Sequence, residues 1–144
     1  MEWPSELEAI STTLIFLATA VGFVFVVRQI RLLERTIKAD ANGRLSDQSI
    51  PILSFIANKP HLYEYFYASK PLVVDDPNRV EVVCVCEMIA NYSDLVVSTL
   101  PDLEPRVRQR WVRFITDTAA NSPAFREHMV RHRLWYSDEL LALF

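Results

Sequence analysis

The longest apolar stretch of the chain runs from Ala9 to Val27 and contains no charge, no proline and a single glycine. Its large apolar residues would cover every side of a helix, whereas a soluble surface helix shows a polar face at a 3.6-residue period. As an α-helix these 19 residues extend roughly 28 Å, close to the thickness of about 30 Å of a bilayer's hydrocarbon core. The stretch predicts a membrane-spanning helix, and the alternative is a helix buried in the core of a soluble domain.

After Val27 the pattern becomes amphipathic. Ile30, Leu33 and Ile37 recur at intervals of three and four residues among basic positions, which predicts that the helix continues beyond the bilayer. Asn42-Gly43 predicts its end, because these residue types commonly terminate helices. We therefore expect an extracytoplasmic tail at residues 1–8, a transmembrane helix with a basic amphipathic continuation at residues 9–41, and a cytoplasmic helical domain at residues 45–144.

The first part of this domain predicts two helices and a loop. Ser46 or Asp47 is the expected N-cap of a helix that has Pro51 in its first turn and ends at Asn58-Lys59-Pro60. An aromatic-rich short helix at residues 60–67 and an extended, proline-bounded loop at residues 68–77 should follow.

The second part is organised around a long helix at residues 79–100 that is capped by Asn78 and apolar nearly all round. Residues 80–85 are rich in valine and also fit a buried strand, but no second strand candidate exists to pair with it. Later helices are expected up to about Ala119, from Ser122-Pro123 to about Arg133, and in a last turn after Ser137, with Trp135 and Tyr136 as anchors of the C-terminus. The predicted fold class is all-α: one N-terminal transmembrane helix followed by a cytoplasmic bundle of about four helices.

The charges beside the apolar stretch predict its orientation. The residues before it include only acidic charges, whereas a basic group follows it, formed by Arg28, Arg31, Arg35 and Lys38. Because basic flanks stay on the cytoplasmic side, we expect the N-terminus outside and the C-terminal domain in the cytoplasm. The acidic start argues against a cleaved signal peptide, Trp3 fits the outer interface, and the basic group should contact lipid headgroups.

Small residues share one side of the predicted span. Ser11, Ala18 and Gly22 are separated by seven and four residues, and Ala18 and Gly22 form a small-xxx-small pair that permits close approach of two helices. The pattern predicts self-association, and the alternative is chance, since small residues are common in spans.

Composition narrows the function classes. The formal net charge is −3 and the pI is about 5.6, which argues against a general nucleic-acid-binding surface. The two cysteines, Cys84 and Cys86, are expected to be small buried residues in a reducing compartment and not metal ligands. His128 and His132 have a metal-ligand spacing, but the neighbouring arginines disfavour a divalent ion, so we expect no metal and no cofactor.

The long helix carries the most notable polar group. Glu87, Asn91 and Asp94 lie on one of its faces, and carboxylates among apolar residues need cations or donors as partners. Candidate partners are Arg106, Arg110, Arg113, Arg126 and Arg133. Three interpretations of Glu87, Asn91 and Asp94 are open: a polar ligand pocket between helices, structural ion pairs, or a solvated stripe. Tyr65 and Tyr67 suggest a ligand platform in the aromatic segment, and the alternative is that they wedge the following loop into the bundle.

Several of these residues resemble a known sequence pattern. The segments are Pro60-x-Leu62-x-x-Tyr65-Phe66-Tyr67-x-x-Lys70-Pro71-Leu72, the acidic positions of the next helix, Trp111, Ser122-Pro123-x-Phe125-Arg126-Glu127 and Trp135-Tyr136-Ser137. Together they resemble a family of small bacterial proteins with one N-terminal span and a helical cytoplasmic domain, to which no activity is assigned. Many of its members have His-Pro-Glu-Leu-Arg where this chain has Lys59-Pro60-His61-Leu62-Tyr63. The resemblance implies the same architecture, a place in the inner membrane of a bacterium, and nothing catalytic.

The sequence contains no recognisable nucleophile motif, phosphate loop or dinucleotide fingerprint. The leading hypothesis is therefore a membrane-anchored interaction or regulatory module, not an enzyme, that associates with itself or with another membrane or cytoplasmic protein. The alternative is a ligand-responsive sensor–effector in stress or phage defence. An enzyme with an unrecognised carboxylate site is a third possibility, and it would depend on Glu87.

Overall fold

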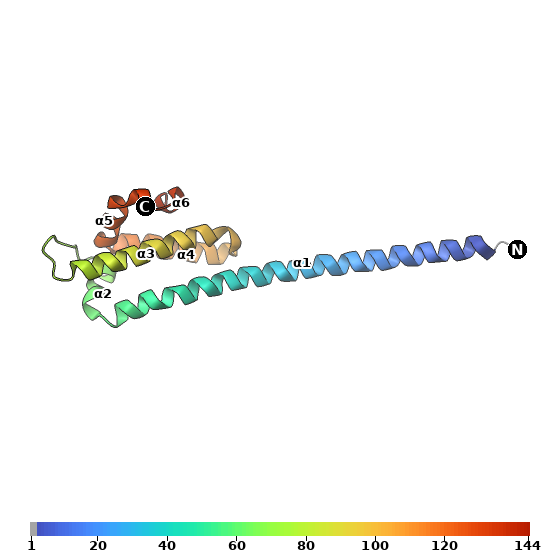
Figure 1. Ribbon diagram of the computed structural model, residues 1–144, viewed down its shortest axis with the longest axis horizontal. Coiled ribbons are helices and arrows are strands. Elements are labelled where there is room, and N and C mark those ends of the chain that lie inside the picture. The colour runs from blue at the N-terminus through green and yellow to red at the C-terminus, as the bar shows by residue number, and fades with distance from the viewer. Residues whose placement is uncertain (1–2) are drawn as a thin grey trace. The chain divides into compact units, whose positions relative to one another are not determined.

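The computed structural model describes the backbone of residues 3–144 and the side chains of residues 11–144, so the side chain of Trp3 lies outside the described residues. Its helices are α1 (Trp3–Ala57), α2 (Pro60–Tyr67), α3 (Arg79–Thr99), η1 (Leu100–Asp102), α4 (Pro105–Asn121), α5 (Pro123–Arg131), η2 (Arg133–Trp135) and α6 (Asp138–Leu141) (Figure 1). Residues 3–144 contain no strand, which confirms the all-α fold class and excludes the strand alternative for residues 80–85.

The chain divides into two compact units, Met1–Ile37 and Lys38–Phe144. The second unit is called the helical domain below. It begins seven residues before the expected position 45, because residues 38–57 of α1 pack within it.

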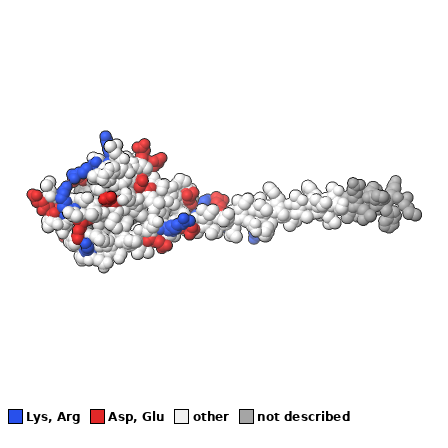
Figure 2. All heavy atoms as spheres, in the orientation of Figure 1, with Lys and Arg blue, Asp and Glu red and all other residues white. Residues whose placement is uncertain are grey.

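The described part of the first unit belongs to α1. The large apolar side chains between Leu14 and Val26 are each 49–72% exposed, and Figure 2 shows this segment without charged residues. Among the described residues, α1 is long and apolar enough to cross a membrane. No residue of its most apolar 18-residue segment is buried.

The core of the helical domain forms around α3. Its buried side chains recur every three or four residues and include Val82, Val85, Ile89 and Val96, as a helix buried along one broad face requires. α3 packs against α4, α5 and α6, and α2 packs against α4 and α5. The other large buried side chains of the domain come from the remaining helices and connections: Leu45, Leu62, Tyr65, Leu103, Ile115, Phe125 and Leu140.

α3 is not buried on all sides, although its nearly all-round apolar sequence suggested that it would be. One face is open to solvent and carries Cys84, Glu87 and Asn91, so the prediction that both cysteines are buried is wrong for Cys84. The two thiols differ because residues two apart on a helix point about 200° away from each other. Cys86 faces the core, where burial first and the charge of Glu127 second raise the pKa of its thiol to about 12.

The predicted helix end at Asn42-Gly43 is wrong, as is the predicted start at Ser46 or Asp47. α1 continues through these residues to Ala57, and Pro51 lies inside the helix instead of in its first turn. No glycine has a positive φ, so Gly43 does not adopt the left-handed conformation of a helix end.

Tertiary contacts explain this continuity. The indole N–H of Trp111 donates to Asn42 Oδ1 at 3.2 Å, and the hydroxyl of Tyr92 donates to the carbonyl of Leu45 at 2.8 Å. Leu45 itself is only 2% exposed. These contacts compensate for a glycine that costs about 1 kcal/mol relative to alanine in a helix interior.

Other predicted boundaries agree with the structure. α1 ends at Ala57, α2 spans Pro60–Tyr67, and α3 follows Asn78. The expected cap is wrong, however, because the side chain of Asn78 makes no cap hydrogen bond. Ser122 caps α5, where its Oγ accepts from the N–H of Phe125 at 3.1 Å, and Pro123 occupies the first turn. α5 ends at Arg131, two residues earlier than expected, and η2 follows.

The helical conformation of Gly43 generates a prediction. A Cβ at Gly43 would meet nothing within 4 Å, so Gly43→Ala should raise the free energy of unfolding of the helical domain by about 0.5–1 kcal/mol. Thermal melting of the full chain in detergent, followed by circular dichroism, measures this as a rise of a few °C. Gly22→Ala, which is equally open but lies outside the domain, should leave the domain's melting unchanged. A lower melting temperature for Gly43→Ala would contradict the continuous helix.

Candidate functional site

The apolar segment of α1 presents the small residues and cations that the sequence singled out. Ser11, Ala18 and Gly22 are exposed, and no atom lies within 4 Å of a Cβ built on Gly22, so this side of the helix is open to close approach. Arg28, Arg31 and Arg35 are exposed at helical intervals of three and four residues, and Lys38 is half-buried.

Within the described residues, Asp94 of the polar stripe of α3 bonds to the C-terminal segment and not to the arginines proposed as its partners. Asp94 Oδ1 accepts from the backbone N–H of Ser137 at 3.2 Å and from its hydroxyl. The same hydroxyl oxygen accepts from the N–H of Leu140, so Ser137 caps α6 as expected. Asp94 therefore fixes the start of α6 against α3, 43 residues away in the chain.

Glu87, seven residues or about two turns before Asp94 on α3, lies near a buried pair of polar side chains. His128 Nε2 and the hydroxyl of Tyr136 share a hydrogen bond of 2.9 Å, and both residues are buried. Burial first, then His132 and Arg131, lowers the pKa of His128, while Glu87 acts in the opposite direction. Burial together with Glu87, Cys86 and Asp94 raises the pKa of Tyr136, so both members of the pair are neutral near pH 7.

Asp94 thus joins α3 to the C-terminal segment, whereas Glu87 is exposed to solvent. Asn91 is exposed, and Asp94 is half-buried and already paired within the domain. Tyr136 anchors the C-terminus as expected, whereas Trp135 is 63% exposed. The hydrogen bonds of Asp94 within the domain favour a structural role for this carboxylate over a role in a ligand pocket.

The two arginines singled out as ligand residues lie elsewhere. Arg126 Nη1 donates to the carbonyls of Ala119 and Ala120, both at 2.9 Å, and so satisfies the last turn of α4. Arg110 is exposed on α4 and borders a groove with residues of α1.

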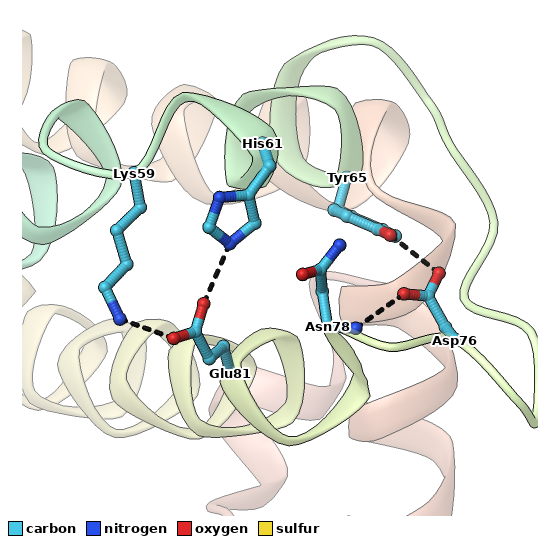
Figure 3. Close-up of polar contacts among 6 residues, drawn as sticks. All are labelled: Lys59, His61, Tyr65, Asp76, Asn78 and Glu81. Atoms are coloured by element: carbon cyan, nitrogen blue, oxygen red, sulfur yellow. Dashed lines mark hydrogen bonds and ion pairs between the residues drawn. The ribbon is translucent and has the colours of Figure 1, made fainter.

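Of the two tyrosines that suggested a ligand platform, Tyr65 is buried and Tyr67 is exposed. Tyr65 is fully buried, and its hydroxyl donates to Asp76 Oδ2 at 2.6 Å, which wedges the loop of residues 68–77 against α2 (Figure 3). Asp76 also accepts from the N–H of Asn78, and these two bonds lower the pKa of Asp76. Tyr67 is 48% exposed and stacks on Tyr63 with ring centroids 4.9 Å apart.

A second polar network, which the sequence did not suggest, joins the start of α2 to α3. Glu81 accepts from Lys59 Nζ at 2.6 Å through one carboxylate oxygen and lies 2.8 Å from His61 Nε2 through the other (Figure 3). The bond from Lys59 first, and that from His61 second, lowers the pKa of Glu81. All three residues are partly solvent-accessible, so this network orients α2 on α3 and contributes little to stability.

Among the described residues, no group of three or more His, Cys, Asp or Glu side chains has an arrangement that could hold a metal ion. Comparisons with protein-family models, with curated proteins and with solved structures find no match.

The buried His128 makes the helical domain sensitive to mild acid. Its pKa is lowered in the folded state, so below about pH 6.5 the unfolded chain binds more protons and stability falls as pH falls. We expect the melting temperature of the full chain in detergent to drop by a few °C between pH 7.5 and pH 5.5. His128→Gln, which can still bond Tyr136, should remove most of this drop.

His61→Gln is the matched control, because it removes an exposed imidazole and should keep the acid-dependent loss. The carboxylates Asp76 and Glu81, whose pKa values are lowered, lose their stabilising contribution only at lower pH, below their ordinary values of 3.8 and 4.5. An unchanged pH profile in His128→Gln would contradict the assignment to His128.

Proposed function

We propose that the chain is a single-pass membrane-anchored module whose helical domain works by protein interaction at the cytoplasmic face of a bacterial inner membrane. On this proposal it belongs with the small single-span proteins that its sequence resembles, and its domain is a bundle of about four helices. The anchor is the segment of residues 9–27, followed by a basic flank that contacts lipid headgroups.

The exposure of the apolar segment carries the proposal. Nine large side chains between Leu14 and Val26 have 49–72% of their surface exposed. Keeping this much apolar surface in water would cost on the order of 10–20 kcal/mol, comparable with the whole stability of a typical domain. A lipid bilayer removes that cost, and the length of the helix matches the thickness of the bilayer.

The basic residues support the proposed orientation. Arg28, Arg31 and Arg35 follow the apolar segment directly and are exposed, which is the arrangement that retains a flank on the cytoplasmic side. The helical domain follows on the same side. The free thiol of Cys86, buried in that domain, is consistent with a reducing compartment.

The open face of Ser11, Ala18 and Gly22 supports self-association as the first interaction. A helix that crosses the bilayer alone has no other part of its own chain to cover this face, and small residues let a second copy approach closely. Another membrane or cytoplasmic protein remains the alternative partner.

Fractionation of cells that express the full chain tests the anchor. We expect the protein in the membrane pellet after an alkaline carbonate wash and in solution only after detergent is added. The double substitution Leu17→Arg with Val21→Arg should release it, because each charge at a bilayer centre costs about 2.5–3.5 kcal/mol. Val74→Arg with Val80→Arg, at apolar positions of the helical domain that are 79% and 76% exposed, should leave it in the pellet.

The same cells report the orientation through the exposed thiol of Cys84. A membrane-impermeant maleimide should label Cys84 only after lysis, whereas Ser5→Cys in a Cys84→Ser background should be labelled in intact cells. Recovery of the wild type in the soluble fraction would remove the anchor, and labelling of Cys84 in intact cells would reverse the topology.

Cysteine crosslinking in native membranes tests self-association. In a Cys84→Ser background, Ala18→Cys should form disulfide-linked dimers under mild oxidation, because position 18 lies on the small-residue face. Phe16→Cys points about 200° away on the same helix and should crosslink at least several-fold less. Equal crosslinking at both positions, or none at either, would leave this face without a partner copy.

A further inference from the structure

A groove on the helical domain lies between α1 and α4. It has a volume of about 230 Å³ and is lined by Asn42, Ser46, Arg110, Trp111 and Phe114. It exists because α1 continues through Asn42-Gly43, which brings Asn42 and Ser46 beside the first half of α4. Its wall therefore combines one cation, two aromatic rings and two small polar side chains.

The aromatic wall of the groove, formed by Trp111 and Phe114, is held in place by contacts with Tyr92. Trp111 and Phe114 contact each other edge-to-face with ring centroids 6.0 Å apart, and Tyr92 of α3 contacts Trp111 at 6.0 Å and Phe114 at 6.5 Å. The hydrogen bonds from Trp111 to Asn42 and from Tyr92 to Leu45 fix this cluster to α1. The rings thus present a preformed apolar surface, which lowers the entropic cost of binding.

Arg110 gives the groove its charge. The residues three and four positions away on its own helix are Arg106, Val107, Arg113 and Phe114, so no carboxylate is within one turn. Within the part of the chain that the structure describes, Arg110 makes no ion pair or hydrogen bond. Its guanidinium fork is free to take an oxyanion with two parallel hydrogen bonds.

The neighbouring charges favour a doubly charged anion. Arg106 is exposed one turn before Arg110 and adds a second positive charge near the groove, whereas the charge of Arg113 is balanced by Asp117, 3.7 Å from its Nε. The volume is below the range of about 300–1,000 Å³ that is usual for drug-sized ligands, so a single ring with one anionic group matches it.

We propose that this groove binds a small phosphate ester of a planar apolar group. The phosphate takes the guanidinium of Arg110, the planar group packs on Trp111 and Phe114, and Asn42 and Ser46 line the polar edge. The site goes beyond the interaction function proposed above and does not depend on it. An occupant would contact both α1 and α4.

Phenyl phosphate is the minimal probe of this chemistry. We expect it to shift the indole N–H resonance of Trp111 saturably, with a Kd of about 1 mM or lower, in the ¹⁵N spectrum of the full chain in phosphatidylcholine nanodiscs. Trp111→Phe identifies the resonance, and those of Trp3 and Trp135 should not move. Inorganic phosphate, which lacks the ring, and phenol, which lacks the charge, should each bind at least tenfold more weakly.

Two substitutions on one helix separate the site from a general charge effect. Arg110→Gln should raise the Kd for phenyl phosphate about tenfold or more, while Arg113→Gln, which removes an equal charge outside the groove, should change it less than about threefold. Arg110→Lys keeps the charge without the fork and should fall between wild type and Arg110→Gln.

The resonance of Trp135, which lies in the helical domain, reports whether each variant remains folded. The proposal is overturned if the Trp111 resonance does not respond, if phenol or inorganic phosphate binds as tightly as phenyl phosphate, or if the two glutamine variants behave alike. None of these results would affect the membrane anchor, which the fractionation experiment tests separately.

Discussion

The removal of apolar surface from water is the constraint on which this structure depends, and the two units meet it differently. Inside the helical domain, α3 presents a broad apolar face that the other helices cover, and Val82, Val85, Val96 and Ile89 on this face are at most 6% exposed. The apolar residues between Leu14 and Val26 are as hydrophobic but lie exposed on α1. Protein does not cover them in the described chain, and the anchor proposed above would place them in lipid.

Polar contacts between distant residues then set the details of the domain. Asp94 fixes the start of α6, Asp76 holds Tyr65 and its loop, and Glu81 connects α2 with α3. Each carboxylate has donors as partners, as partly buried charges require. These contacts explain why several residues that attract attention as candidate ligands serve to position helices.

The groove at Arg110 differs from these contacts, because its cation has no ion pair among the described residues while hydrogen bonds and ring contacts hold the aromatic side chains beside it. Its position also illustrates how a wrong boundary can hide a site. With a helix end at Asn42-Gly43, Asn42 and Ser46 would belong to a connection. Because α1 is continuous, Asn42 and Ser46 lie one turn apart on the same face of this helix and both line the groove with α4.

Local signals in the sequence were sufficient for most helix boundaries. Ser122-Pro123 and Ser137 predicted the starts of α5 and α6 correctly, because a side-chain cap acts within three residues of itself. Periodicity and length predicted α3 and the all-α class, since a helix of 21 residues repeats its pattern over several turns. The same signals failed at Gly43, where contacts with Trp111 and Tyr92 outweigh a local preference of about 1 kcal/mol.

The amino-acid order by itself therefore determined the position of most helices, the capped starts of α5 and α6, and which stretch is the most apolar, because these properties arise within a few neighbouring residues. Only the tertiary structure decided the partners of the polar side chains. Asp94 meets Ser137 and not an arginine, and Trp111 meets Asn42 across 69 residues. Such pairings depend on how helices pack in three dimensions, which spacing along a single helix does not specify.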